Sequence, residues 1–138
     1  MPARLSDARA NNTLDVEFAG AASTSPAIRY LALLTTAPTT NTGTSAVEVT
    51  GGAYARVAVT KNATNWPAAA ARGIANGVAF TWPTATAAWG SVVGVASYDA
   101  ATAGTFLDYF DLAVDKAVAS GDTPQLAVGA LTATSSGA

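Results

Sequence analysis

The main candidates for acid–base or metal chemistry in this chain are carboxylates, because it contains no histidine and no cysteine. These absences exclude disulfides, thiolate nucleophiles, Ser-His triads and most transition-metal sites. The densest group of carboxylates lies towards the C-terminal end: Asp99, Asp108, Asp111, Asp115 and Asp122. Asp108 and Asp111 point to opposite faces of a regular strand, so they form no catalytic dyad. The ligand spacing of a calcium loop is also missing. We therefore predict no metal, no cofactor and no enzymatic activity, and a glycosidase with two acids ranks last among our hypotheses.

A second group of chemically capable residues follows a pair of glycines. Gly51 and Gly52 precede Tyr54 and Arg56, which would suit a ligand site. The same glycines also permit a tight turn or bulge without any ligand. Arg56 falls on the outward side of its predicted strand, where it either reaches a carboxylate of a neighbouring molecule or is solvated.

Two tryptophans stand near predicted loops. Trp66 and Trp89 could stack on a sugar ring, as in a carbohydrate-binding module, or could close the ends of a β-sandwich. The candidate surface contacts of the chain are therefore Tyr54, Arg56, Trp66 and Trp89.

The elements that must position these residues are mostly strands. Residues 28–35 are apolar on both alternating sets, which is typical of a central strand covered on both faces. Alternation predicts further strands at 53–60 and 74–82, a hairpin of 91–98 with 105–114, and an extended segment over 125–134. Residues 36–46 and 62–72 have the composition of long irregular connections.

The N-terminal stretch differs from the rest. Ser6 can cap a short helix, and we treat residues 1–20 as an arm or short helix that precedes a single β-sandwich domain over 21–138. This segment is either a contact arm or a helix that covers one end of the sandwich. The candidate arm contacts are Arg4, Leu5, Arg9, Leu14 and Phe18.

Composition limits the class of protein. The chain has 138 residues, of which 50% are hydrophobic and 12% charged, with a net charge of −2. These values predict one folded domain, and the absence of a basic cluster argues against nucleic acid as a partner. No membrane-spanning run and no secretory signal are expected. The pattern favours an all-β fold, a jelly-roll-like β-sandwich. Its core should come from six aromatic residues: Trp66, Phe80, Trp82, Trp89, Phe106 and Phe110.

The order of several short motifs resembles one group of bacteriophage proteins. After the helix near Leu5–Ala8 come Tyr30-Leu31-Ala32-Leu33, then 48–56 (EVTGGAYAR), 81–86 (TWPTAT), Trp89-Gly90, Tyr98-Asp99-Ala100 and 120–123 (SGDT). Over nearly its whole length the chain is similar to small tailed-phage virion proteins that are described loosely as tail fibre proteins or as capsid decoration (cement) proteins. The fibre-shaft signatures, namely collagen-like, heptad and β-helix repeats, are missing.

The resemblance implies a non-enzymatic structural protein of the virion. Our first hypothesis is a decoration protein that is made in the host cytoplasm and binds the outer surface of the capsid. Its partners would be the major capsid protein and copies of itself, as a dimer or trimer, because binding only the assembled shell stabilises the assembly. The alternative is a tail or baseplate adhesin module that binds a host surface glycan.

Overall fold

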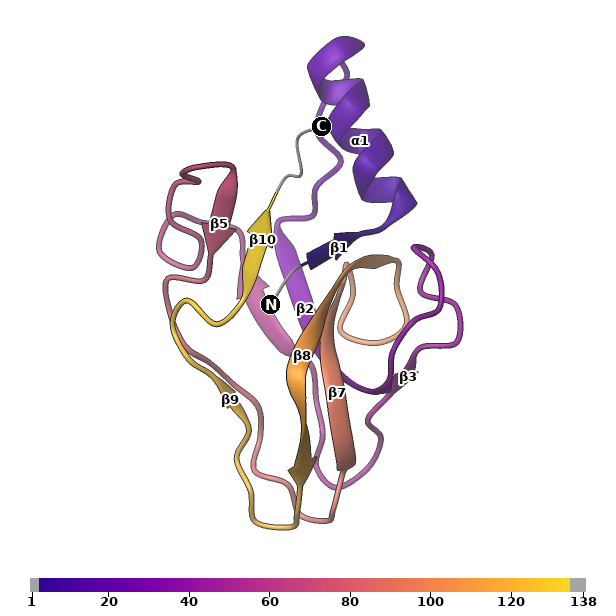
Figure 1. Ribbon diagram of the computed structural model, residues 1–138, viewed down its shortest axis with the longest axis vertical. Helices are drawn as coiled ribbons and strands as arrows, with labels where there is room; N and C mark the ends of the chain where they lie inside the picture. The colour runs from indigo at the N-terminus through magenta and orange to yellow at the C-terminus, as the bar shows by residue number, and fades with distance from the viewer. Residues whose placement is uncertain (1–2, 135–138) are drawn as a thin grey trace.

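The computed structural model describes residues 3–134, and its largest element is one antiparallel sheet (Figure 1). Six strands of this sheet are described, in the order β1-β8-β7-β2-β3, with β4 also paired to β2. Their bounds are β1 Ala3–Leu5, β2 Ile28–Thr36, β3 Val47–Glu48, β4 Val57–Thr60, β7 Gly90–Tyr98 and β8 Phe106–Val118. The all-β prediction is confirmed; the strand order does not by itself show a jelly roll.

Strand β2 lies in the middle of the sheet, as its two apolar faces predicted. It pairs with β7 through Leu31 opposite Ser97 and Leu33 opposite Val95, and its other edge is shared by β3 and β4. The predicted hairpin is also confirmed, since β7 pairs with β8 and residues 99–105 connect them.

The strand predicted over 53–60 begins later than expected. Gly51, Gly52 and Ala53 all have positive φ angles, of 74°, 56° and 61°, so the chain makes a tight turn here and β4 starts only at Val57. A Cβ on Gly52 would lie 2.7 Å from the Trp89 indole nitrogen, so the close approach of these two residues also requires glycine.

A second layer faces the sheet and consists of irregular segments with two short ladders. β5 (Gly73–Ala75) pairs with β10 (Thr132–Thr134), and β6 (Phe80–Thr81) pairs with β9 (Gln125–Leu126). The continuous strands predicted over 74–82 and 125–134 are therefore wrong.

Asn76 explains both interruptions. Its side chain is 2% exposed; Nδ2 donates to the carbonyls of Val78 (2.7 Å) and Ala127 (2.9 Å), and Oδ1 accepts from the Leu131 N–H (2.8 Å). The buried amide takes backbone partners that a continuous ladder would otherwise have satisfied.

The main core lies between the sheet and the second layer. Trp82, Phe80, Trp89 and Phe110 are at most 5% exposed and pack with leucines and valines of β2 and β7. A smaller cluster on the opposite face of the sheet holds Leu34, Ala96, Phe106 and Tyr109. The predicted aromatic core is thus confirmed, except that Trp66 is only half-buried.

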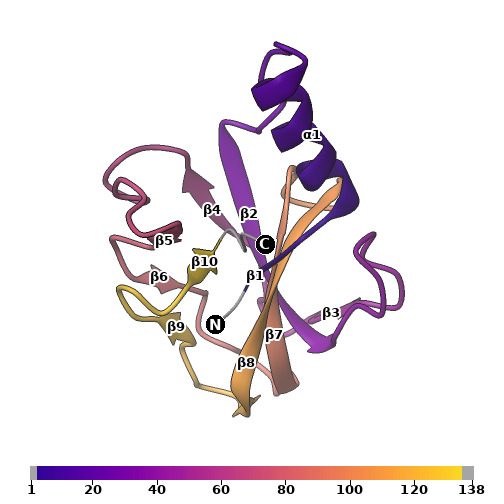
Figure 2. The same cartoon turned by 45° about the horizontal axis from the view of Figure 1, so that its top comes forward.

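The N-terminal residues form both a strand and a helix. Ser6 accepts a hydrogen bond from the Arg9 N–H (3.3 Å) and caps α1 (Asp7–Phe18), which confirms the predicted helix. β1 adds to the sheet beside β8, with Leu5 opposite Asp108. α1 buries no residue and projects from one end of the body (Figures 1 and 2).

The domain boundary after residue 20 stays a prediction. Within residues 3–134, no helix has the length and apolarity needed to cross a membrane.

Candidate functional site

The arginine predicted as a surface contact is the centre of a closed polar cluster. Arg56 donates from Nε to Glu48 Oε1 (2.8 Å) and from Nη2 to Glu48 Oε2 (2.7 Å), a two-pronged ion pair. Its Nη1 donates to the carbonyls of Ala100 (2.7 Å) and Ala103 (2.8 Å) in the β7–β8 turn. The guanidinium carbon also lies 3.9 Å from the centre of the Tyr98 ring.

Tyr54 completes the same cluster. Its hydroxyl donates to Glu48 Oε1 (2.7 Å) and accepts from the Leu33 N–H (3.0 Å), which joins the turn after β3 to the central strand. Its ring meets Trp89 edge-on at 5.3 Å, and the Trp89 indole donates to the Gly52 carbonyl (2.9 Å). Burial, followed by the hydrogen bond to Glu48, raises the pKa of Tyr54 far above its ordinary value.

This geometry corrects two expectations about the cluster. The prediction of a solvated Arg56 is wrong, because the carboxylate, two carbonyls and Tyr98 take up its guanidinium, and the hydrogen bond to Glu48 raises its pKa. Trp89 does not fit a surface contact, because it is 5% exposed in the core. Tyr54 is packed against that core, and Trp66 is half-buried with its ring 5.9 Å from Phe80. The cluster is therefore a structural clamp, and these aromatic rings are poorly placed to stack on a sugar.

A second ionic group was not found by sequence reasoning. Arg29 of β2 pairs with Asp108 of β8, and the Ser97 hydroxyl donates to the same carboxylate oxygen at 2.9 Å. Asp108 is 3% exposed. Burial, followed by the charge of Arg29, lowers the pKa of the nearby Arg9. An arginine inside an otherwise apolar central strand was the available signal, since such a charge requires a buried partner.

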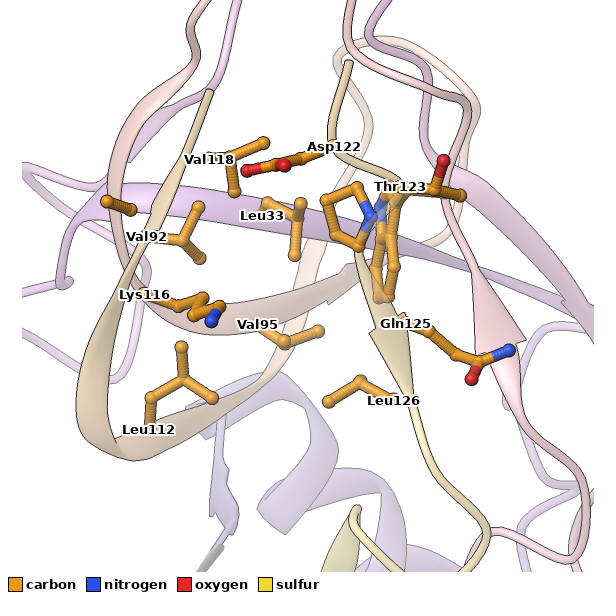
Figure 3. Close-up of a pocket in the computed structure, with 13 residues that line it drawn as sticks. Leu33, Val92, Val95, Leu112, Lys116, Val118, Asp122, Thr123, Gln125 and Leu126 are labelled. Carbon is orange, nitrogen blue, oxygen red and sulfur yellow. The ribbon is translucent and has the colours of Figure 1, made fainter. Parts of the chain in front are cut away.

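A groove of about 440 Å³ lies between β8 and the segment that leads into β9. Its wall is mostly apolar and includes Leu33 and Val95 from the main sheet, Leu112 from β8 and Leu126 from β9 (Figure 3). Beyond Phe110, β1 no longer pairs with β8, so no strand of the described chain covers this part of its edge. No local sequence pattern marks the groove, because its wall comes from segments far apart in the chain.

The polar groups of the groove divide into two kinds. Lys116 and Asp122 extend towards the hollow from opposite sides, whereas Thr123 and Gln125 turn away from it (Figure 3). Thr123 contacts Thr84 (2.7 Å) and Gln125 donates to the Thr81 hydroxyl (2.8 Å). The groove is thus an apolar trough with two opposite charges at its mouth.

The predicted arm residues are dispersed. Leu14 and Phe18 are 55% and 85% exposed on α1, and Leu5 is 44% exposed on β1. Arg9 is half-buried, with its Nε buried and unpartnered among the described residues. Arg4 lies in β1 opposite Tyr109; its side chain falls outside the described part. The arm therefore presents an apolar surface made by Leu14 and Phe18.

The carboxylates were considered above as possible metal ligands. Within residues 3–134, no three carboxylates lie close enough together to hold a metal ion. Asp99 accepts from the Thr105 N–H (2.6 Å) and Asp122 from the Ala119 N–H (2.9 Å), so both close turns at the ends of β8.

Comparison with known proteins finds a matching protein family. A family model described as "Podophage GP4 fiber I protein gp80" matches residues 4–134. No curated protein matches the chain. The match spans β1 to β10 and therefore includes both layers and α1.

Proposed function

The chain belongs to the podophage GP4 fiber I protein gp80 family, and from this premise we propose that it is an adhesin module of a virion fibre that binds a host surface glycan. As a member of this family it is a structural protein of the phage virion, of fibre type. The observation that carries the proposal is the extent of the match, because the whole described fold is the unit that the family shares. The absence of catalytic activity stays a prediction.

The host-contacting surface in this proposal is the loop between β2 and β3. Thr40, Thr42 and Thr44 are linked through their hydroxyls, at 2.8 Å between Thr40 and Thr42 and 3.0 Å between Thr42 and Thr44. The loop packs on the smaller core cluster, since a Cβ on Gly43 would lie 2.8 Å from the Phe106 ring. A row of hydroxyls held on a rigid base can exchange hydrogen bonds with a sugar at low entropic cost.

The purified chain tests the adhesin proposal as a competitor of phage adsorption and as a probe of a glycan array. We expect it to slow adsorption and to bind a subset of glycans saturably. Replacing Thr40, Thr42 and Thr44 by alanine should weaken both effects at least tenfold, whereas replacing the exposed Thr13, Thr24 and Thr102 should leave them unchanged. A chain that neither competes nor binds any glycan contradicts the proposal.

Capsid decoration is the second candidate, and α1 supports it. A helix that buries no residue and exposes Leu14 and Phe18 is suited to lie on a neighbouring virion protein, here the major capsid protein at the outer surface of the head. Cryo-electron microscopy of the virion separates the candidates. Density in many copies over the head supports decoration, and density confined to the tail supports the fibre adhesin.

A further inference from the structure

An uncovered apolar pair lies at one end of the molecule. Leu14 and Phe18 are four residues apart on α1, so they lie on the same face of the helix, and they are 55% and 85% exposed. No residue of the helix is fully buried, although Arg9 is half-buried against its own chain. An exposed leucine–phenylalanine pair of this kind is suited to contact another molecule.

An unfilled apolar groove lies towards the other end. The groove between β8 and β9 has a volume of about 440 Å³, within the range of pockets that hold organic ligands and so large enough for an aromatic side chain. It opens beside the C-terminal half of β8, whereas α1 projects beyond the opposite end of the sheet (Figures 1 and 2). The helix of one chain therefore cannot occupy the groove of the same chain.

The charges of the two surfaces are complementary on one side of the groove. Asp15 and Glu17 flank the apolar pair, and the last turn of α1 carries no basic residue, so the negative end of the helix dipole is uncompensated. The mouth of the groove presents the Lys116 ammonium (Figure 3). The Asp122 carboxylate lies on the opposing side of the mouth, so an acidic helix end is attracted only towards the Lys116 side of the groove.

We propose that α1 of one copy seats Phe18 and Leu14 in the β8–β9 groove of a second copy of this chain. The two contacting surfaces are different, so the interface is heterologous, and its repetition closes into a ring such as a trimer or continues as a filament. This contact gives a physical basis for the self-association expected from the sequence. It does not depend on glycan binding, so adsorption and self-association can fail separately.

Sedimentation equilibrium of the purified chain over a wide concentration range tests the contact. We expect the wild-type mass to rise to a multiple of 13.7 kDa. Phe18→Ser, which removes the apolar knob at an exposed position, should sediment as a single chain. Lys116→Trp, which fills the groove from an exposed lining position whose side chain extends towards the hollow (Figure 3), should do the same, whereas Ala113→Trp, on the same strand but outside the lining, should associate normally.

Mixing the two defective variants gives the sharpest result. Phe18→Ser retains an intact groove and Lys116→Trp retains an intact helix, so an equimolar mixture should form a 1:1 complex that neither forms alone. Lys116→Glu should weaken wild-type association by roughly two- to fivefold, and Glu17→Lys in the same chain should restore it. A wild-type chain that stays a single chain at high concentration, or a Phe18→Ser variant that associates like wild type, overturns the proposal.

Discussion

The Arg56–Glu48 pair and the Arg29–Asp108 pair show two ways in which one small fold holds an arginine. Arg56 lies among loops and turns, and each of its nitrogens donates to a carboxylate or carbonyl oxygen. Arg29 lies on the central strand and shares one carboxylate oxygen with Ser97. The other oxygen of Asp108 and Nε of the nearby Arg9 are buried without a hydrogen-bond partner among the described residues.

From this difference we infer that complete pairing, more than depth of burial, decides how much such a group adds to the stability of the fold. The Arg56 group joins segments that have little regular structure, so its hydrogen bonds replace a ladder. The Arg29 group lies in a sheet that is already paired on both sides of β2, and its charges mainly compensate each other. A pair of this second kind adds little net stability when intact and costs much when one partner is removed.

Removing Asp108 should have the largest effect. In Asp108→Ala, Arg29 keeps its charge beside Arg9 with no carboxylate to balance it, so we expect the free energy of unfolding to fall by about 3–5 kcal/mol. Urea unfolding followed by tryptophan fluorescence measures this loss. Asp115→Ala, at an exposed position of the same strand, should change stability by less than about 0.5 kcal/mol. Equal stabilities for the two variants would show that the buried pair is not needed.

Changing Arg56 should have an intermediate effect. Lysine keeps the charge but cannot donate to both Glu48 oxygens and both turn carbonyls, so Arg56→Lys should lower the free energy of unfolding by about 2 kcal/mol. Arg72→Lys, at an exposed position, is the matched control and should be neutral. A neutral Arg56→Lys would mean that charge alone, without the fork geometry, holds the cluster.

Alkaline pH should weaken the same cluster through Tyr54. The pKa of Tyr54 is raised in the folded chain, while a phenol in the unfolded chain ionises near its ordinary value of about 10. This contribution to stability is therefore fully present below about pH 10 and is lost as the pH rises further, by up to about 1.4 kcal/mol per pH unit. Burial raises the pKa of Tyr98 as well, so the stability of Tyr54→Phe should still fall with rising pH, although less steeply.

Urea unfolding between pH 9 and pH 11 measures the expected difference. Tyr54→Phe should lose about 1 kcal/mol at neutral pH, because Glu48 and the Leu33 N–H lose a partner, and should then fall less steeply than wild type. An alkaline slope identical to that of wild type would place the titrating group elsewhere.

The smallest effect is expected outside both ionic groups. Phe18→Ser, used above to break self-association, should change the unfolding free energy of the single chain by less than about 0.5 kcal/mol, because the ring is 85% exposed. Unfolding is measured at a concentration where wild type is also a single chain, so that self-association does not add to the unfolding free energy. A loss of 2 kcal/mol or more would mean that the ring supports its own fold instead of a neighbouring copy.

Particular residues explain how far the fold could be predicted. Strand β2, the β7–β8 hairpin and the helix cap at Ser6 were predictable, because apolar alternation and a capping hydroxyl act over a few neighbouring positions. The interruption at Asn76 was not, since the side chain finds its partners at residues 127 and 131. The candidate surface residues were also predicted only in part. The sequence left open whether Phe18 lies on a contact arm or covers the sandwich and whether Trp89 lies in the core or at the surface, and the structure exposes Phe18 and buries Trp89. Arg56 was expected to be solvated and instead lies in a packed cluster.

By its composition and local patterning, the amino-acid sequence determined an all-β domain with aromatic residues in its core and a capped helix before it, without histidine or cysteine chemistry. The tertiary structure alone decided that Glu48 meets Arg56, that Arg29 meets Asp108, and that Leu33, Leu112 and Leu126 line one groove. The physical reason is the distance along the chain over which each interaction acts. Alternation and capping act between near neighbours, whereas ion pairs and grooves depend on where the packing of two layers brings distant segments together.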